Sequence, residues 1–281
     1  MAANSISYSQ FSMFQNCRIR WYNEYALNKR VFEQSIHTIF GTAMHETLQH
    51  YLTVMYGKSV KEADALSLSS DLRNRITEEY KKASDKMGHF STPEELYEFW
   101  QDGVACLNYF QKNRRIYFPS KQHELLGIET ELAVPLIKDV VFKGFIDVVI
   151  KDHRTGRIKI IDLKTSTRGW NKYQKKDKTK TAQLVLYKEF YAKQFNVDPE
   201  TIDVEYIILR RKINEELEFV PKRVQLFVPA SGKPTRNKVG KDLFEFIETV
   251  FKEDGSYNMD LDINVPKCKD RWCKYCRNTK K

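Results

Sequence analysis

The spacing of apolar and polar residues divides the chain into a helical first part and a strand-rich second part. Across residues 8–55, apolar side chains recur every three or four positions, as on one face of an amphipathic helix. Residues 60–117 continue as charged amphipathic segments, and the stretch STPEE at 91–95 is a helix-start signal. The pattern therefore predicts that residues 1–120 are mostly helical.

After residue 120 the apolar period changes towards two, which indicates β-strands. Helices are expected within this part at 179–195 and 238–252. The expected strands are 124–134, 140–150, 157–164, 202–211 and 222–229.

This order of elements predicts an α/β fold with a restriction-endonuclease-like mixed sheet, flanking helices and a helical N-terminal lobe. The sequence has no internal repeat and no low-complexity linker, so we expect one domain over residues 1–281. Within it, 1–120 would form the helical lobe, 121–255 the catalytic α/β core, and 256–281 a tail that packs back on the N-terminus.

Composition narrows the choice of partner. The 281 residues are 41% hydrophobic, and neither a run of eighteen apolar residues nor a secretory leader is present, so we expect a cytoplasmic protein without a membrane contact. The 47 Lys and Arg residues exceed the 37 Asp and Glu residues, giving a formal charge of +10. This excess favours a polyanionic partner such as nucleic acid.

The most unusual stretch is GFIDVVIKDHRTGRIKIIDLKTS at 144–166, an apolar hairpin that contains carboxylates. Asp147 lies in a strand whose two faces are both apolar, where an unpaired carboxylate would be costly. A turn centred on Arg154 and Thr155 places Asp147 directly opposite Asp162, with Cβ atoms about 5 Å apart. Strand alternation puts Lys164 on the same face as Asp162.

Two carboxylates at that distance repel each other unless a divalent cation lies between them. Ligands that are all acidic oxygens indicate Mg²⁺ or Mn²⁺ rather than zinc. The alternative is an ordinary hairpin, in which Asp162 and Lys164 form a salt bridge and Asp147 caps a backbone group.

Other groups could complete a site around these carboxylates. His45 lies four residues before Gln49 on one helix face, and Glu129 precedes the hairpin on the neighbouring strand. Gln183 and Tyr187 share a helix face and could orient a phosphate or a base. Each has an ordinary alternative as a surface or core residue.

A basic segment, RGWNKYQKKDKTK at 168–180, follows the Asp-x-Lys strand. Lysines for phosphates interleaved with aromatic rings for stacking suit single-stranded nucleic acid. A solvated mobile loop is the alternative, and LRRKI at 209–213 could extend the same patch. The residues expected to contact DNA are Arg168, Trp170, Lys172, Tyr173, Lys175 and Lys176.

Three of the five cysteines lie in CKDRWCKYC at 268–276, with the spacing C-x4-C-x2-C. In a reducing compartment, clustered thiols more often hold metal than form disulfides. Unligated surface thiols are the alternative. Cys106, in an amphipathic helix, is expected to be a small core residue.

These segments together resemble the PD-(D/E)XK nucleases, in particular the RecB-like exonuclease branch that includes AddB and CRISPR-associated relatives. The resemblance covers roughly residues 5–280 and rests on the order of five short motifs. They are Gly41 with His45-Glu46, then Glu129, GFIDVV with Asp147, IIDLKTS with Asp162-Leu163-Lys164, and QLVLY with Gln183 and Tyr187.

The resemblance implies a role for each of these positions. It implies that His45, Asp147, Asp162 and the carbonyl of Leu163 hold Mg²⁺ or Mn²⁺, and that Lys164 positions or activates the attacking water. It further implies that Gln183 and Tyr187 contact the DNA strand near the scissile phosphate. Glu129 matches less closely than these residues, and Glu131 is its rival.

Relatives with an iron-sulfur cluster place one cysteine near the N-terminus and three near the C-terminus. By this resemblance, Cys17, Cys268, Cys273 and Cys276 hold a [4Fe-4S] cluster with a structural role. The spacing of the last three cysteines departs from the C-x2-C-x5-C of those relatives, and zinc accepts four thiolates equally well.

The expected function is a metal-dependent DNA exonuclease that acts on single strands or duplex ends in recombination, repair or phage DNA metabolism, with a recombination or replication protein as partner. The alternatives are a non-catalytic module that binds DNA or a partner, an endonuclease of the same superfamily, and a basic α/β protein that binds no divalent metal.

Overall fold

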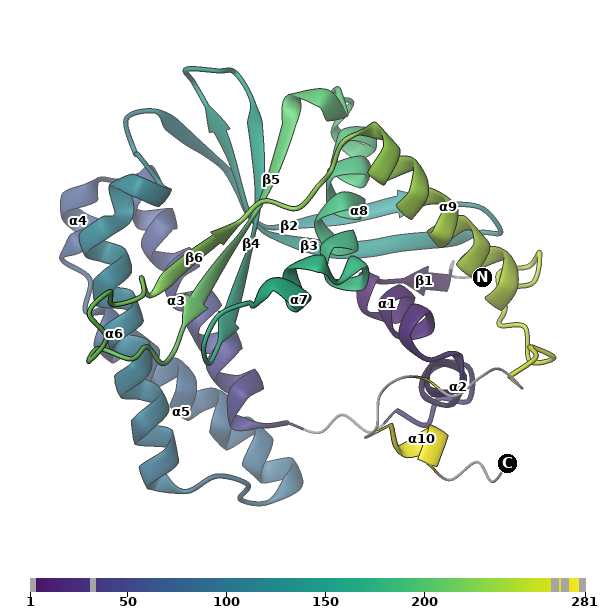
Figure 1. The fold of residues 1–281 in the computed structure, drawn as a ribbon, viewed down its shortest axis with the longest axis horizontal. Helices are drawn as coiled ribbons and strands as arrows, with labels where there is room; N and C mark the ends of the chain where they lie inside the picture. The colour runs from purple at the N-terminus through teal and green to yellow at the C-terminus, as the bar shows by residue number, and fades with distance from the viewer. Residues whose placement is uncertain (1–3, 31–33, 264–267, 269–272, 278–281) are drawn as a thin grey trace.

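The computed structural model describes residues 4–30, 34–263, 268 and 273–277 (Figure 1). A six-stranded mixed sheet lies between two groups of helices, and the first part of the chain is helical. The predicted α/β fold class is therefore confirmed. None of the described helices is long and apolar enough to cross a membrane.

The helices of the first part are more divided than the apolar periodicity predicted. Cys17 has an extended backbone (φ −159°, ψ 102°), so it ends one helix and caps the next instead of continuing a single one. The predicted start at 91–95 is confirmed, since Thr92 caps a helix with Pro93 in its first turn. The helices are α1 (Tyr8–Asn16), α2 (Arg18–Trp21), a π-helix (Tyr22–Ala26), α3 (Ile36–Gly57), α4 (Val60–Asp64), α5 (Leu68–Met87) and α6 (Pro93–Tyr117).

The sheet has the order β1-β3-β4-β5-β6, with β2 paired to β3. β3 is antiparallel to β2 and β4, and β4 is parallel to β5. The predicted hairpin register is confirmed, because Val148 pairs with Ile161 and Lys151 with Ile158. The strands are β1 (Asn4–Ile6), β2 (His123–Pro135), β3 (Val140–Asp152), β4 (Ile158–Ser166), β5 (Ile202–Arg210) and β6 (Val224–Phe227).

The helices of the second part begin or end at residues that the periodicity did not identify. A short helix, α7 (Lys172–Lys176), lies in the basic segment for which a solvated loop was the alternative, because Asn171 and Gln174 form a capping box. α8 (Lys178–Phe195) is as predicted within one residue. α9 (Lys233–Val250) begins five residues before the predicted start, with Pro234 in its first turn. A 3₁₀ turn (Pro199–Thr201) precedes β5, and α10 (Lys274–Arg277) lies near the C-terminus.

Two hydrophobic cores cover the two faces of the sheet. On one face, α3, α5 and α6 pack on residues such as Val148, Ile161 and Leu163. On the other, α1, α8 and α9 pack on residues such as Val149 and Ile160. Figure 1 shows the two groups of helices on opposite sides of the strands.

At Asp147, the alternation of side chains along β3 between the two faces of the sheet is interrupted. Ile146 packs in the core under α8, whereas Val148, two positions later, packs in the core under α3. Strict strand alternation would put both residues on one face. The neighbours of β3 also change along its length, since β1 pairs with residues 140–142 and β4 with residues 148–151. Asp147 therefore lies where β4 separates from β3, open to side chains from both helical layers.

Candidate functional site

Three acidic residues lie in one row across β2, β3 and β4. Ile128 pairs with Val148 and Thr130 with Ile146, which places Glu129 opposite Asp147. The β3–β4 register places Asp162 on the other side of Asp147. Asp147 forms a regular backbone pair with neither Glu129 nor Asp162, so the row coincides with an opening in the sheet.

Asp147 fills that opening with its side chain. Its Oδ2 accepts a hydrogen bond from the backbone N–H of Leu163 at 2.6 Å, a donor that continued strand pairing would have used. The carboxylate thus takes the place of a backbone carbonyl and holds the Asp-x-Lys strand in position. This fixes Asp147 beside the residue whose carbonyl the family resemblance implies to be a metal ligand.

Asp162 and Lys164 lie on the same face of β4 and form an ion pair, with Nζ 2.8 Å from Oδ2. The Asp162 side chain is 2% exposed, whereas that of Lys164 is 32% exposed. Among the described residues, no well-aligned hydrogen bond reaches Oδ2 of Asp162. The salt bridge allowed by the ordinary alternative is therefore present, with Oδ2 of the buried Asp162 as its acceptor.

His45 reaches the row from α3, with Nδ1 3.6 Å from Oδ2 of Asp147. Burial, reinforced by the charge of Lys164, lowers the pKa of His45 to about 4, against the opposing pull of the nearby carboxylates. The imidazole is therefore neutral at pH 7 and keeps a lone pair for a metal ion.

Glu129 has a left-handed backbone conformation, with φ of 47°, which is unfavourable for a side chain of this kind. Gln49 on α3 holds it there: its Nε2 donates to Oε1 of Glu129 at 2.5 Å and to the carbonyl of Asp147 at 3.3 Å. Glu129 interacts electrostatically with His45 and Asp147. Its rival Glu131 is exposed on β2, as Glu129 is, but occurs in neither of these interactions.

Residues of α8 and α1 close the opposite side of the row. Nε2 of Gln183 lies 3.3 Å from the hydroxyl of Tyr187, and Tyr187 packs so closely on Gly144 that an added Cβ there would lie 3.0 Å from its ring. Burial raises the pKa of Tyr187 to about 12. Tyr8 of α1 interacts electrostatically with Lys164 and Asp162, a neighbour that no sequence motif indicated.

The electrostatics of the row fit a cation. Burial raises the pKa of both Asp147 and Asp162 to about 6, against the attraction of Lys164. Burial lowers the pKa of Lys164, but the attraction of Asp162 and Asp147 outweighs it, so the net shift is upward and Lys164 stays charged.

The donor set is two carboxylates, a neutral imidazole and the carbonyl of Leu163, which suits Mg²⁺ or Mn²⁺. Among the described residues, only the four cysteines have ligand atoms that all lie within 4.8 Å of one another. The ligand atoms of the acidic row are spaced more widely. Such a row would leave part of the coordination of a cation to water, as Mg²⁺ sites commonly do. The residues therefore fit the metal that the resemblance implies.

A family model described as the PD-(D/E)XK nuclease superfamily matches residues 5–279. The chain belongs to this superfamily. A comparison with curated proteins finds no significant match. Membership of the PD-(D/E)XK superfamily indicates a metal-dependent nuclease with DNA as its substrate, in agreement with the acidic row.

The basic segment of this PD-(D/E)XK chain does not present all its residues to a ligand. Trp170 packs against Tyr206, with ring centroids 4.9 Å apart, and its backbone binds Gln225, so it anchors the segment. Trp170 is therefore partly buried, and its contact with DNA stays a prediction. Tyr173 is 72% exposed on α7 and is available for stacking. The basic residues beside these rings are Arg168, Lys172, Lys175 and Lys176, of which Lys175 is partly buried.

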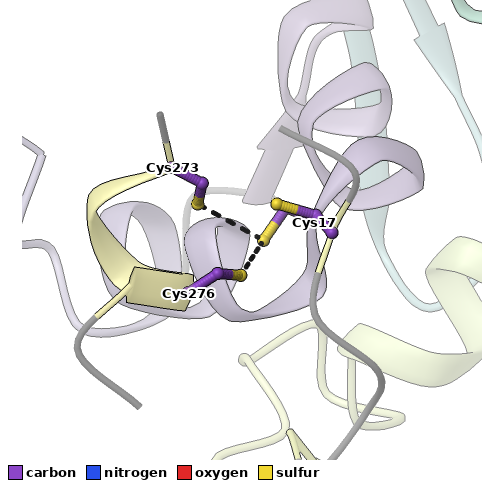
Figure 2. Close-up of side chains that lie close together, drawn as sticks. Cys17, Cys273 and Cys276 are labelled. Carbon is purple, nitrogen blue, oxygen red and sulfur yellow. Dashed lines mark hydrogen bonds between the residues drawn. The ribbon is translucent and has the colours of Figure 1, made fainter. Parts of the chain in front are cut away.

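The structure brings the four predicted cysteines together, although part of the tail (264–267, 269–272 and 278–281) lies outside the described residues. The ligand atoms of Cys17, Cys268, Cys273 and Cys276 all lie within 4.8 Å of one another. Figure 2 shows Cys17 between Cys273 and Cys276, with sulfur separations of 3.9 and 3.5 Å. Cys106 lies apart in the core and donates to the carbonyl of Arg210.

These separations bear on the kind of metal. A tetrahedral zinc ion with Zn–S bonds of about 2.3 Å puts its sulfurs roughly 3.8 Å apart. An iron-sulfur cubane is a larger body and holds its four thiolates further apart. The geometry thus fits a four-thiolate metal centre and matches zinc more closely, whereas the family resemblance implies [4Fe-4S].

The raised carboxyl pKa values predict how pH governs stability. A carboxyl whose folded pKa is raised stabilises the fold below its unfolded pKa, near 4, and loses this contribution as pH rises through 6. The loss is of the order of 2 to 3 kcal/mol for one carboxyl. We expect Mn²⁺ to raise the melting temperature at pH 8 and to have little effect at pH 5. Calorimetry with Mn²⁺ and with EDTA measures this, and an equal shift at both pH values would contradict it.

Proposed function

We propose that the chain is a metal-dependent deoxyribonuclease that works as an exonuclease on single-stranded DNA or DNA ends. The observation that carries the proposal is the row of Glu129, Asp147 and Asp162 beside Lys164, placed where the sheet opens. A stable hairpin has no need of three carboxylates at adjacent positions, since like charges there are destabilising.

Each residue would contribute to hydrolysis of a phosphodiester through its own chemistry. Asp147, Asp162, the neutral imidazole of His45 and the carbonyl of Leu163 would hold Mg²⁺ or Mn²⁺. When bound, the ion acidifies water and neutralises charge on the phosphate. Lys164 stays protonated beside Asp162 and directs positive charge to the place where negative charge develops. Gln183 and Tyr187 would hold the strand from the α8 side.

Features around the row support a single-stranded substrate. The exposed Tyr173 lies among lysines on α7, which directly follows the strand that carries Lys164. Aromatic rings beside cations bind single strands without sequence preference. We infer that DNA approaches the row across α7, and that the substrate arises from recombination, repair or phage DNA metabolism with a recombination or replication protein as partner.

The four cysteines would hold a structural metal centre. Their thiolates join the segment after α1 to the tail, and they would do so for either zinc or [4Fe-4S]. Iron, sulfide and zinc analysis of protein purified without oxygen distinguishes the two.

Digestion of end-labelled linear single-stranded, linear duplex and covalently closed circular DNA tests the proposed activity. We expect Mn²⁺-dependent and Mg²⁺-dependent release of nucleotides from linear DNA, suppression by EDTA, and no cutting of the circle. Cutting of the circle would favour an endonuclease of the same superfamily. DNA binding without any cleavage would favour a non-catalytic module and would overturn the proposal.

A matched pair of substitutions on β2 tests the part assigned to Glu129. Glu129→Gln removes one charge from the row while keeping its size and its contact with Gln49, and we expect kcat/KM to fall at least about tenfold. Glu131→Gln, two positions away and equally exposed but without an interaction with His45 or Asp147, should change kcat/KM less than about twofold. Equal effects of the two substitutions would remove Glu129 from the site.

A further inference from the structure

The first half of β3 presents two side chains to solvent beside the acidic row. Phe142 and Ile146 face the core under α8, where the ring of Phe142 lies 4.3 Å from that of Phe190. Because side chains alternate along a strand, Lys143 and Phe145 are directed to the opposite face. Both of them are exposed.

Phe145 is the residue of interest on this face. Its side chain is 52% exposed and belongs to neither of the two hydrophobic cores. Within the described part of the chain, it is the one exposed aromatic residue on a β-strand, and its ring contacts no other aromatic ring. A single exposed apolar side chain is ordinary on a protein surface, so the position of the ring decides what it can do.

That position is next to the opening in the sheet. Phe145 precedes Asp147 by two residues, which puts their Cα atoms about 7 Å apart. On the edge of β3 that faces β4, β1 pairs with residues 140–142 and β4 with residues 148–151. Residues 143–147 therefore have no partner strand on this edge among the described elements. The ring of Phe145 lies beside a stretch of strand that a ligand can approach.

Lys143 adds a positive charge on the same face. It makes no ion pair or hydrogen bond with any residue that the structure describes. The order along β3 is thus a lysine, an aromatic ring and the carboxylate of Asp147, at intervals of two residues. A lysine suits a phosphate, a ring suits the face of a base, and the carboxylate suits a divalent cation.

We propose that Phe145 stacks on the base of the nucleotide next to the phosphate that is cleaved, with Lys143 near the backbone of the same strand. The inference rests on the proposed nuclease function, because Asp147 marks the place of the cleaved phosphate. A base inside a duplex is stacked on its neighbours, so the ligand is an unpaired base of a single strand. A phenyl ring has no hydrogen-bonding group, so the contact tolerates any base.

Phe145→Leu tests the proposal, with Phe244→Leu as its matched control. Phe244 is also 52% exposed, but it lies on α9. Affinity for a short labelled single strand is measured by anisotropy with Mn²⁺, in a Lys164→Ala background that prevents cutting. We expect Phe145→Leu to weaken binding about tenfold, the loss of one stacked base. Phe145→Tyr, which keeps a ring, and Phe244→Leu should each stay within about twofold.

Oligonucleotides that lack one base at a defined position separate stacking from a structural effect. We expect one position at which removal of the base weakens binding to the chain with Phe145 about tenfold, and at which Phe145→Leu causes no further loss. Ring and base then act as a pair. A loss from Phe145→Leu that is equal on every oligonucleotide would overturn the stacking contact.

Two further measurements keep the proposal testable. If Phe145→Leu does not fold, the base-removal series on the chain with Phe145 still decides, since no position with a tenfold loss would overturn the contact. Lys143→Gln should weaken binding to all these oligonucleotides alike, because it removes a contact with the backbone and not with a base. A loss in Lys143→Gln confined to one base position would contradict its assignment.

The outcome is independent of whether the chain cleaves DNA. Absence of cleavage by the chain with intact Lys164 would contradict the proposed function and leave the binding comparison valid. Cleavage together with unchanged affinity in Phe145→Leu would overturn the stacking contact alone. In the intact chain, Phe145→Leu should raise KM about tenfold with kcat changed less than about twofold.

Discussion

Asp162→Asn is expected to reduce Mn²⁺-dependent DNA cleavage by at least about a thousandfold. Asp162 is buried, lies opposite Asp147, and binds Nζ of Lys164 through Oδ2 at 2.8 Å. Asparagine keeps the shape but removes the charge that would bind the cation and hold Lys164. Lys164→Ala should cause a loss of similar size, because the charge beside the developing anion is removed.

Two substitutions, one on β4 and one on β5, serve as controls. Asp203→Asn on β5 removes a partly exposed carboxylate that pairs with Arg157, and Lys159→Ala on β4 removes a lysine that contacts Glu205. Both should keep cleavage within about threefold of the original chain. Circular dichroism verifies that Asp162→Asn stays folded. Cleavage by folded Asp162→Asn at the original rate would show that the row is not catalytic.

Cys17→Ser is expected to release the metal of the tail and to lower the free energy of unfolding by at least about 3 kcal/mol. Cys17 is the one cysteine of the cluster outside the tail, and its Sγ also caps α2 by accepting from the backbone N–H of Arg20 at 3.4 Å. Without it, the three remaining thiolates no longer join the two ends of the chain. The measurements are iron, sulfide and zinc content together with thermal unfolding.

Cys106→Ser is the control for Cys17→Ser, because it removes a buried thiol that is not part of the four-cysteine cluster. Cys106 is as buried as Cys17 and donates to the carbonyl of Arg210 at 3.1 Å, a bond that serine can also form. We expect this variant to keep its full metal content. Full metal content in Cys17→Ser, or none in the original chain, would contradict the four-thiolate centre.

The hairpin was predictable because its signals are local. The turn residues DHRTG fix the register, and the register alone brings Asp147 opposite Asp162. The shared face of Asp162 and Lys164 follows from the alternation of a strand. The tail cysteines were identifiable from their spacing, since clustered thiols have few other uses in such a chain.

What the sequence could not reveal depends on contacts between distant elements. The left-handed backbone of Glu129 is held by Gln49, 80 positions away, and no local pattern records that pairing. The change of face at Asp147 arises because β1 and β4 occupy different stretches of β3. The packing of Trp170 on Tyr206 could not be predicted, because an aromatic residue between lysines has the same sequence pattern whether it stacks on a base or packs against the core.

The cysteine centre has a consequence for the order in which the chain is completed. Cys17 and Cys276 are 259 positions apart, so at about 5–20 residues per second the first ligand emerges from the ribosome roughly 13 to 50 seconds before the last. The acidic row, by contrast, is complete once β4 and α8 have been made. A chain interrupted after α9 would therefore carry every residue of the proposed catalytic site but would lack Cys268, Cys273 and Cys276. A metal ion held by all four thiolates would therefore have to wait until Cys276 has been made.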